Sequence, residues 1–168
     1  MGEPIEAVFH SSSKGTTEAS GAIWNDRPYL VSVESPETAE DVPNLVTEVL
    51  FSPQELQAAL SAKFPNLQFT GSPEDWFSTP ILTHSGRVDS ISLCGTDIKG
   101  TQLRSALGLR SSAFTVDCTD DVFTFTVSGY GHGVGMSQYG ANVYAKQGWS
   151  YEEILSHYYP ETQLTSTG

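Results

Sequence analysis

Short runs in which apolar and polar positions alternate dominate this chain, and they predict more strands than helices. Runs bounded by glycine, proline or other turn residues predict strands over residues 5–9, 29–33, 46–51, 76–83, 87–94, 113–118 and 122–127. Apolar residues three and four apart predict helices between Ser52 and Pro65 and over residues 100–107. Two further helices are expected over residues 137–147 and from Ser150 to about residue 158, where Ser150 and Glu153 form a capping box.

These elements alternate irregularly along the chain, which predicts the α+β class: a single domain over residues 1–168 with a mainly antiparallel sheet, hairpins and three to four short helices. One hairpin is expected around Thr119, Asp120 and Asp121. The acidic stretch over residues 35–44 is predicted to be a surface loop. A chain of 168 residues buries about 70% of its unfolded surface, so folding requires neither a metal nor a disulfide.

The charge balance narrows the classes of ligand. Twenty acidic residues against eight basic ones give a formal net charge of −12. Such a surface repels polyphosphates and anionic lipids, which disfavours nucleic acid or a membrane surface as the main partner. We therefore expect neutral, cationic or zwitterionic substrates.

No apolar run reaches the roughly 18 residues of a membrane span, and the N-terminus lacks the pattern of a signal peptide. The first predicted strand begins almost at Met1, so we expect the sequence to be a piece of a longer protein. Cys94 and Cys118 lie in predicted strand surroundings without a Cys-x-x-Cys spacing. A disulfide between them and two buried free thiols are both open interpretations.

A glycine recurs at every second position from Gly129 to Gly135, with one imidazole, His132, at the centre of the run. Because glycine has no Cβ, its backbone can take a positive φ and let a ligand approach the peptide groups. Such a run weakens regular structure, which favours a binding loop. The structural alternative is a turn between a strand and a helix in which His132 is packed or solvated.

Two segments of the chain resemble a known family. Residues 129–159 are similar to the C-terminal signature of the stage II sporulation protein D family, which includes the amidase-enhancer proteins of bacterial cell walls. Residues 4–20, with Trp24 and residues 28–33, resemble the central segment of the same family, whereas residues 44–93 match it only loosely.

The resemblance implies cleavage of peptidoglycan glycan strands of the lytic transglycosylase type during engulfment in sporulation. It also implies an extracytoplasmic protein that faces the cell wall and is anchored in the membrane or secreted in its full length. Other cell-wall hydrolases of an engulfment complex are the further partners that it suggests.

Glycan cleavage needs a carboxylic acid that protonates the glycosidic oxygen. The resemblance implies that the sugar's own 6-hydroxyl then closes an anhydro ring, and that the catalytic glutamate lies in an alanine-rich helix on the N-terminal side. No such helix precedes Pro4, so we expect the acid outside this chain, or a non-catalytic wall-binding or amidase-enhancing module. Within the two segments Glu18 is the candidate acid, with a capping or ion-paired carboxylate as the alternative.

Hydroxyls, amides and an imidazole can hydrogen-bond the hydroxyls and acetamides of sugars. We expect a glycan-binding site built from His10, Ser11, Ser12, Ser13, Arg104, His132, Gly133, Ser137, Gln138 and Tyr139. A serine nucleophile with a histidine base is the alternative, but the Gly-x-Ser-x-Gly elbow is missing. The four histidines lack metal-ligand spacing, and serines stand where some family members carry cysteine and histidine, so neither a metal nor another cofactor is expected.

Overall fold

The computed structural model describes residues 2–167, which form two compact units. Unit 1 combines the residues up to Leu45 with those from Gly129 onward, and unit 2 comprises Val46–Ser128. The α+β class is confirmed, because the described residues contain four α-helices and mainly antiparallel strands. The assignment of residues 1–168 to one domain stays a prediction.

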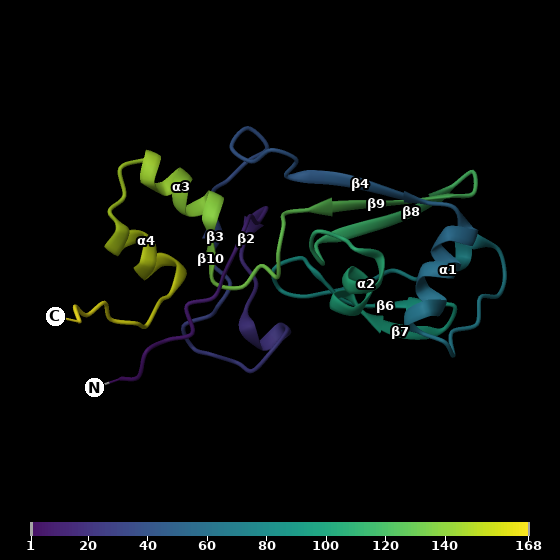
Figure 1. Cartoon of the computed structure of the whole chain (residues 1–168), viewed down its shortest axis with the longest axis horizontal. Coiled ribbons are helices and arrows are strands. Elements are labelled where there is room, and N and C mark those ends of the chain that lie inside the picture. Colours follow the sequence, from purple (N-terminus) through teal and green to yellow (C-terminus); the bar gives the residue numbers. More distant parts are fainter. Residues whose placement is uncertain (1, 168) are drawn as a thin grey trace. The chain divides into compact units, whose positions relative to one another are not determined.

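The first sheet of unit 2 is antiparallel, with the strand order β4, β9, β8 (Figure 1). Its strands are β4 (Val46–Phe51), β8 (Phe114–Thr119) and β9 (Val122–Ser128). Because side chains alternate across a strand, Phe123, Phe125 and Val127 of β9 all point into the core and are at most 1% exposed. The predicted hairpin is confirmed, and Asp120 and Asp121 both take a positive φ in its turn.

The second sheet of unit 2 departs from the sequence expectation. Its antiparallel strands are β5 (Ile81–Leu82), β6 (Val88–Leu93) and β7 (Thr96–Lys99). The predicted strand over residues 76–83 is wrong in its extent, because Trp76 stacks on Phe123 in the core and pairing is limited to β5 and a bridge at Phe77. The strand β7 went unpredicted because only Ile98 of its four residues is buried, which leaves no alternation to read.

Two helices complete unit 2, α1 (Pro53–Lys63) and α2 (Gly100–Leu107), and both confirm the sequence prediction. The hydroxyl of Ser52 accepts the Glu55 N–H at 3.1 Å, as an N-cap should. Leucines of both helices pack into one apolar core with the aromatic side chains of β8 and β9. Unit 2 is therefore held mainly by apolar packing.

Unit 1 contains little regular sheet. The parallel pair β1 (Phe9–His10) with β10 (Met136–Ser137) and the antiparallel pair β2 (Gly15–Thr16) with β3 (Glu34–Ser35) are each two residues long. The predicted strands over residues 5–9 and 29–33 are wrong, since only Phe9 of these ten residues lies in a strand. Leu30 is apolar because it fills the core of unit 1 from a loop, and Val33 bonds Thr17 without forming a ladder.

The helices of unit 1 are α3 (Gln138–Lys146) and α4 (Tyr151–Tyr158), and both were predicted (Figure 1). Ser137 and Ser150 are their N-caps, and each hydroxyl accepts a backbone N–H of the first helical turn. The core beneath them contains Leu30, Val134, Tyr144, Ile154, Tyr158 and Tyr159. Among residues 2–167, none of the helices is long and apolar enough to cross a membrane.

Candidate functional site

The two segments that carry the family resemblance meet in unit 1. Ser12 exchanges two main-chain hydrogen bonds with Tyr130, at 3.2 and 2.9 Å. The N–H of Glu18 donates to the Gly133 carbonyl at 2.8 Å, and His10 of β1 pairs with Ser137 of β10. The main chain thus brings residues 10–18 against the glycine-rich loop.

His10 is held by hydrogen bonds at both ring nitrogens. Its ring is only 4% exposed, and Nδ1 donates to the Val134 carbonyl at 3.1 Å. A carbonyl oxygen can only accept, so this contact places a proton on Nδ1. In the neutral ring Nε2 is then an acceptor, which receives the Ser13 hydroxyl hydrogen at an Nε2–Oγ distance of 2.6 Å.

His132 binds the same peptide group from its other side. Its Nδ1 accepts the Val134 N–H at 3.0 Å, so the neutral ring carries its proton on Nε2. The ring centroids of His10 and His132 lie 5.8 Å apart. One peptide therefore fixes two imidazoles in opposite tautomers.

A glycine is required at position 131 for this approach. Gly131 has a φ of +109°, and a Cβ placed there would lie 2.8 Å from the Cβ of His10. Any side chain would push the loop away from His10 and strain the backbone. The glycine periodicity seen in the sequence thus has a direct purpose beside the buried histidine.

Glu18, the candidate acid, lies within this cluster, and its side chain is only 2% exposed. Its Oε1 accepts the Ala19 N–H at 2.9 Å. Ser12 and Ser13 are similarly buried, while Ser11 is half-buried and its carbonyl accepts the Tyr139 N–H at 3.1 Å. Because Ser13 has no exposed area, its geometry favours holding His10 in place over acting as a nucleophile.

Exposed groups adjoin this buried cluster. The ring of Trp24 lies 5.0 Å from that of His132, edge to face, and Trp24 is 48% exposed. Gln138 is exposed and Tyr139 is half-buried at the start of α3, while Gly133 is buried. Trp24 was not among the predicted site residues, although it lies in the resembling segment as the only tryptophan there.

Ser137 and Glu37 form a second buried polar contact in unit 1. The Ser137 hydroxyl donates to Glu37 Oε2 and accepts the Gly140 N–H. A Cβ on Gly140 would collide with Glu37 Oε2, so the helix can start this close to the carboxyl only with glycine. Ser137 is fully buried, and its predicted contact with a substrate stays a prediction.

Glu37 corrects the prediction that residues 35–44 are a surface loop, because its side chain is only 3% exposed. Burial raises the pKa of Glu37, although hydrogen bonds from the Ser137 and Ser35 hydroxyls partly oppose the shift. Its Oε1 has no hydrogen-bond partner. Sequence reasoning missed this residue because neighbouring acidic and proline residues look like solvated loop.

Arg104, the remaining predicted site residue, belongs to α2 of unit 2. Its Nε donates to the Leu109 carbonyl at 3.3 Å, and its place in a shared site stays a prediction. Cys94 and Cys118 of the same unit are free thiols. Within residues 2–167, no group of three or more histidine, cysteine or acidic side chains is arranged to hold a metal.

Curated relatives match almost the whole chain. It is 38% identical over 164 residues to stage II sporulation protein D of Bacillus subtilis (strain 168) and 39% identical to that of Bacillus amyloliquefaciens, with 97% of this chain covered in each case. It is 28% identical over 224 residues to the amidase enhancer of Bacillus subtilis (strain 168). The predicted resemblance is thereby confirmed.

The chain spans less than half of these relatives: 46% of each sporulation protein and 30% of the amidase enhancer. No protein-family model matches it.

Proposed function

We propose, from its relation to the stage II sporulation protein D family, that this chain is the glycan-recognising part of a longer peptidoglycan-processing protein. The longer protein would cleave glycan strands as a lytic transglycosylase during engulfment in sporulation. It would act outside the cytoplasm, facing the cell wall, with glycan strands as its substrate and other wall hydrolases as its partners.

The observation that carries the proposal is the cluster of His10, Ser13, Glu18 and His132, which lies where the two family-like segments meet. Buried hydrogen bonds hold these side chains before any ligand arrives, and such preorganisation favours recognition. The net charge of −12 supports a neutral sugar over a polyanion. Exposed Trp24 and Gln138 supply an aromatic face and an amide beside or close along the chain to this cluster.

We place the catalytic acid in another part of the longer protein. The acid must reach the glycosidic oxygen while it carries a proton. Glu18 is enclosed by its own segment, and Glu37 is engaged beneath α3 with Ser137. Neither carboxyl combines exposure to a sugar chain with a place in the family-like surface.

A second candidate function is a non-catalytic module that binds wall glycan or enhances a partner amidase. The similarity to a protein named amidase enhancer, which extends over 98% of this chain, favours it. Both functions share the recognition of glycan and differ in whether a bond is broken.

The test compares this chain with the full-length natural protein on peptide-free glycan strands. Mass spectrometry should detect anhydro-muramic ends with the full-length protein and not with the 168-residue chain. Release by the short chain that Glu18→Gln abolishes, while Glu48→Gln leaves it unchanged, would place the acid at Glu18 instead. Binding by both proteins without release by either would support the non-catalytic module.

A further inference from the structure

Unit 1 contains a pocket of about 390 Å³ beside the cluster described above. This volume lies in the range of roughly 300–1,000 Å³ that is typical of small-molecule sites. Leu30 and Val8 supply apolar lining, Trp24 an aromatic surface, and Arg27 and Glu6 polar groups. Trp24 also contacts the ring of His132, so the pocket and the histidine cluster adjoin.

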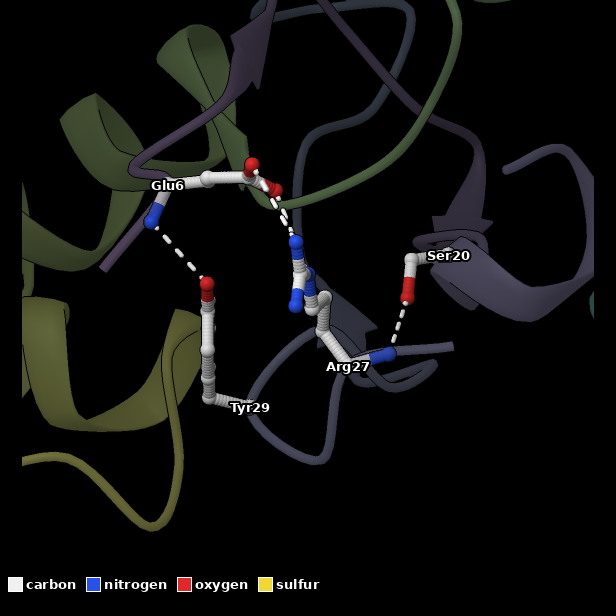
Figure 2. Close-up of polar contacts among 4 residues, drawn as sticks. All are labelled: Glu6, Ser20, Arg27 and Tyr29. Atoms are coloured by element: carbon white, nitrogen blue, oxygen red, sulfur yellow. Dashed lines mark hydrogen bonds and ion pairs between the residues drawn. The ribbon is translucent and has the colours of Figure 1, made fainter. Parts of the chain in front are cut away.

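The segment that forms this pocket is closed on Ser20, which is fully buried. The Ser20 hydroxyl accepts the Arg27 N–H at 2.9 Å, and its carbonyl accepts the Trp24 N–H at 2.7 Å (Figure 2). The N–H of Ser20 in turn donates to the Leu30 carbonyl at 2.8 Å. Three main-chain attachments to one residue hold Trp24 and Arg27 in place without a ligand.

The polar groups of the pocket are already neutralised as a pair. Arg27 reaches both carboxylate oxygens of Glu6, with Nε at 3.3 Å and Nη2 at 3.4 Å (Figure 2). The two side chains are 43% and 62% exposed, and such exposed pairs are weak enough to share their hydrogen bonds with a ligand. Together they offer donors and acceptors with no net charge, which matches the hydroxyls of a neutral sugar.

We propose that this pocket binds one pyranose ring of a neutral N-acetylated sugar chain, with the ring lying on the indole of Trp24. Arg27, Glu6 and the neighbouring amide of Asn25 hydrogen-bond its hydroxyl and acetamido groups. An anionic sugar is disfavoured, because it would have to displace Glu6 from Arg27 on a chain of net charge −12. This inference rests on the proposed function and gives the glycan one defined subsite next to His132.

The experiment titrates the folded 168-residue chain with chitotriose and follows ¹H–¹⁵N NMR signals, including those of the tryptophan indoles. The Trp24 indole should shift on binding. Trp24→Ala should weaken binding about tenfold, the effect of losing one aromatic contact. Arg27→Gln should weaken it less, and Trp24→Phe should retain part of the affinity. Tyr151→Ala is the matched control, because Tyr151 is an aromatic residue of the same unit, 65% exposed, that does not line the pocket.

The outcomes separate the subsite from the proposed function. Chitotriose binding that shifts the amides of residues 131–139, but is unchanged by Trp24→Ala, would overturn the subsite and leave glycan recognition standing. No binding by the folded wild-type chain at millimolar chitotriose would count against both. Tighter binding of a trigalacturonic acid than of chitotriose would refute the neutral-sugar assignment.

Discussion

The two units of this chain use their interiors differently. In unit 2 the buried residues are mainly leucines and aromatic rings, and the buried polar or charged residues among those described are Arg87, Ser111 and Ser112. In unit 1 a smaller apolar core shares the interior with buried polar side chains, listed here: His10, Ser12, Ser13, Thr17, Glu18, Ser20, Ser35, Glu37 and Ser137.

This difference separates stability from chemistry. A buried polar group costs free energy unless hydrogen bonds replace its water, and unit 1 supplies such bonds from its main chain and serines. Unit 2 can rely on apolar burial, which needs no directional partners. The same chain thus keeps a stable apolar core in one unit and a site of fixed geometry in the other.

The largest expected effect tests the apolar side of this comparison. Phe125 is fully buried and contacts the rings of Phe51, Phe77 and Phe114. Phe125→Ala should lower the free energy of unfolding of unit 2 by about 3–5 kcal/mol, because it removes buried area and leaves a cavity. Urea denaturation measures the loss, with Leu50→Ala on the exposed position of β4 as the control. A loss no larger than that of the control would contradict the assignment of this core.

The next prediction concerns the buried carboxyl of unit 1. Because burial raises the pKa of Glu37 above its ordinary 4.5, the folded chain keeps a proton that the unfolded chain releases. Its contribution to stability is therefore greatest below about pH 4.5 and is lost as the pH rises through the folded-state pKa. Glu37→Gln should remove this part of the slope in a plot of unfolding free energy against pH.

Glu48→Gln is the matched control, since Glu48 is an exposed carboxylate of β4 in unit 2. A slope that both variants change equally would mean that Glu37 titrates as an ordinary surface acid. Denaturation at a series of pH values between 4 and 8 gives the comparison directly.

The smallest effect on stability is expected at the accessible histidine. His132 is half-buried, and its contacts are to Trp24, His10 and the Val134 N–H. His132→Ala should cost less than ~1 kcal/mol of unfolding free energy but weaken chitotriose binding several-fold. Calorimetry measures both quantities on the same sample. A loss of several kcal/mol would instead make His132 a structural residue of the unit 1 core.

The sequence predicted best those elements whose signals are local. Capping serines, the stop at Gly108 and the alternation in β9 gave α1, α2, α3, α4 and the hairpin close to their observed bounds. In unit 1 an apolar loop residue such as Leu30 has the same local pattern as a strand residue. Only the packing of distant segments distinguishes the two.

The predicted site was recovered in part for the same reason. His10, Ser13, Glu18 and His132 stand in two long family-like segments, so they could be named before their contacts were known. Glu37 could not be named, because its burial depends on Ser137 and Gly140, which lie far along the chain. Its local sequence gives no sign of that contact.

The division of the chain also sets an order of events during synthesis. Unit 2 is continuous in sequence, so all its partners have been made once Ser128 has left the ribosome. His10 and its partner Val134 are 124 residues apart, and the first segment must wait for the glycine loop to be translated. Because contacts distant in sequence form late, the apolar unit is complete before the histidine pair can assemble. Newly made chains thus acquire stability before they acquire the site.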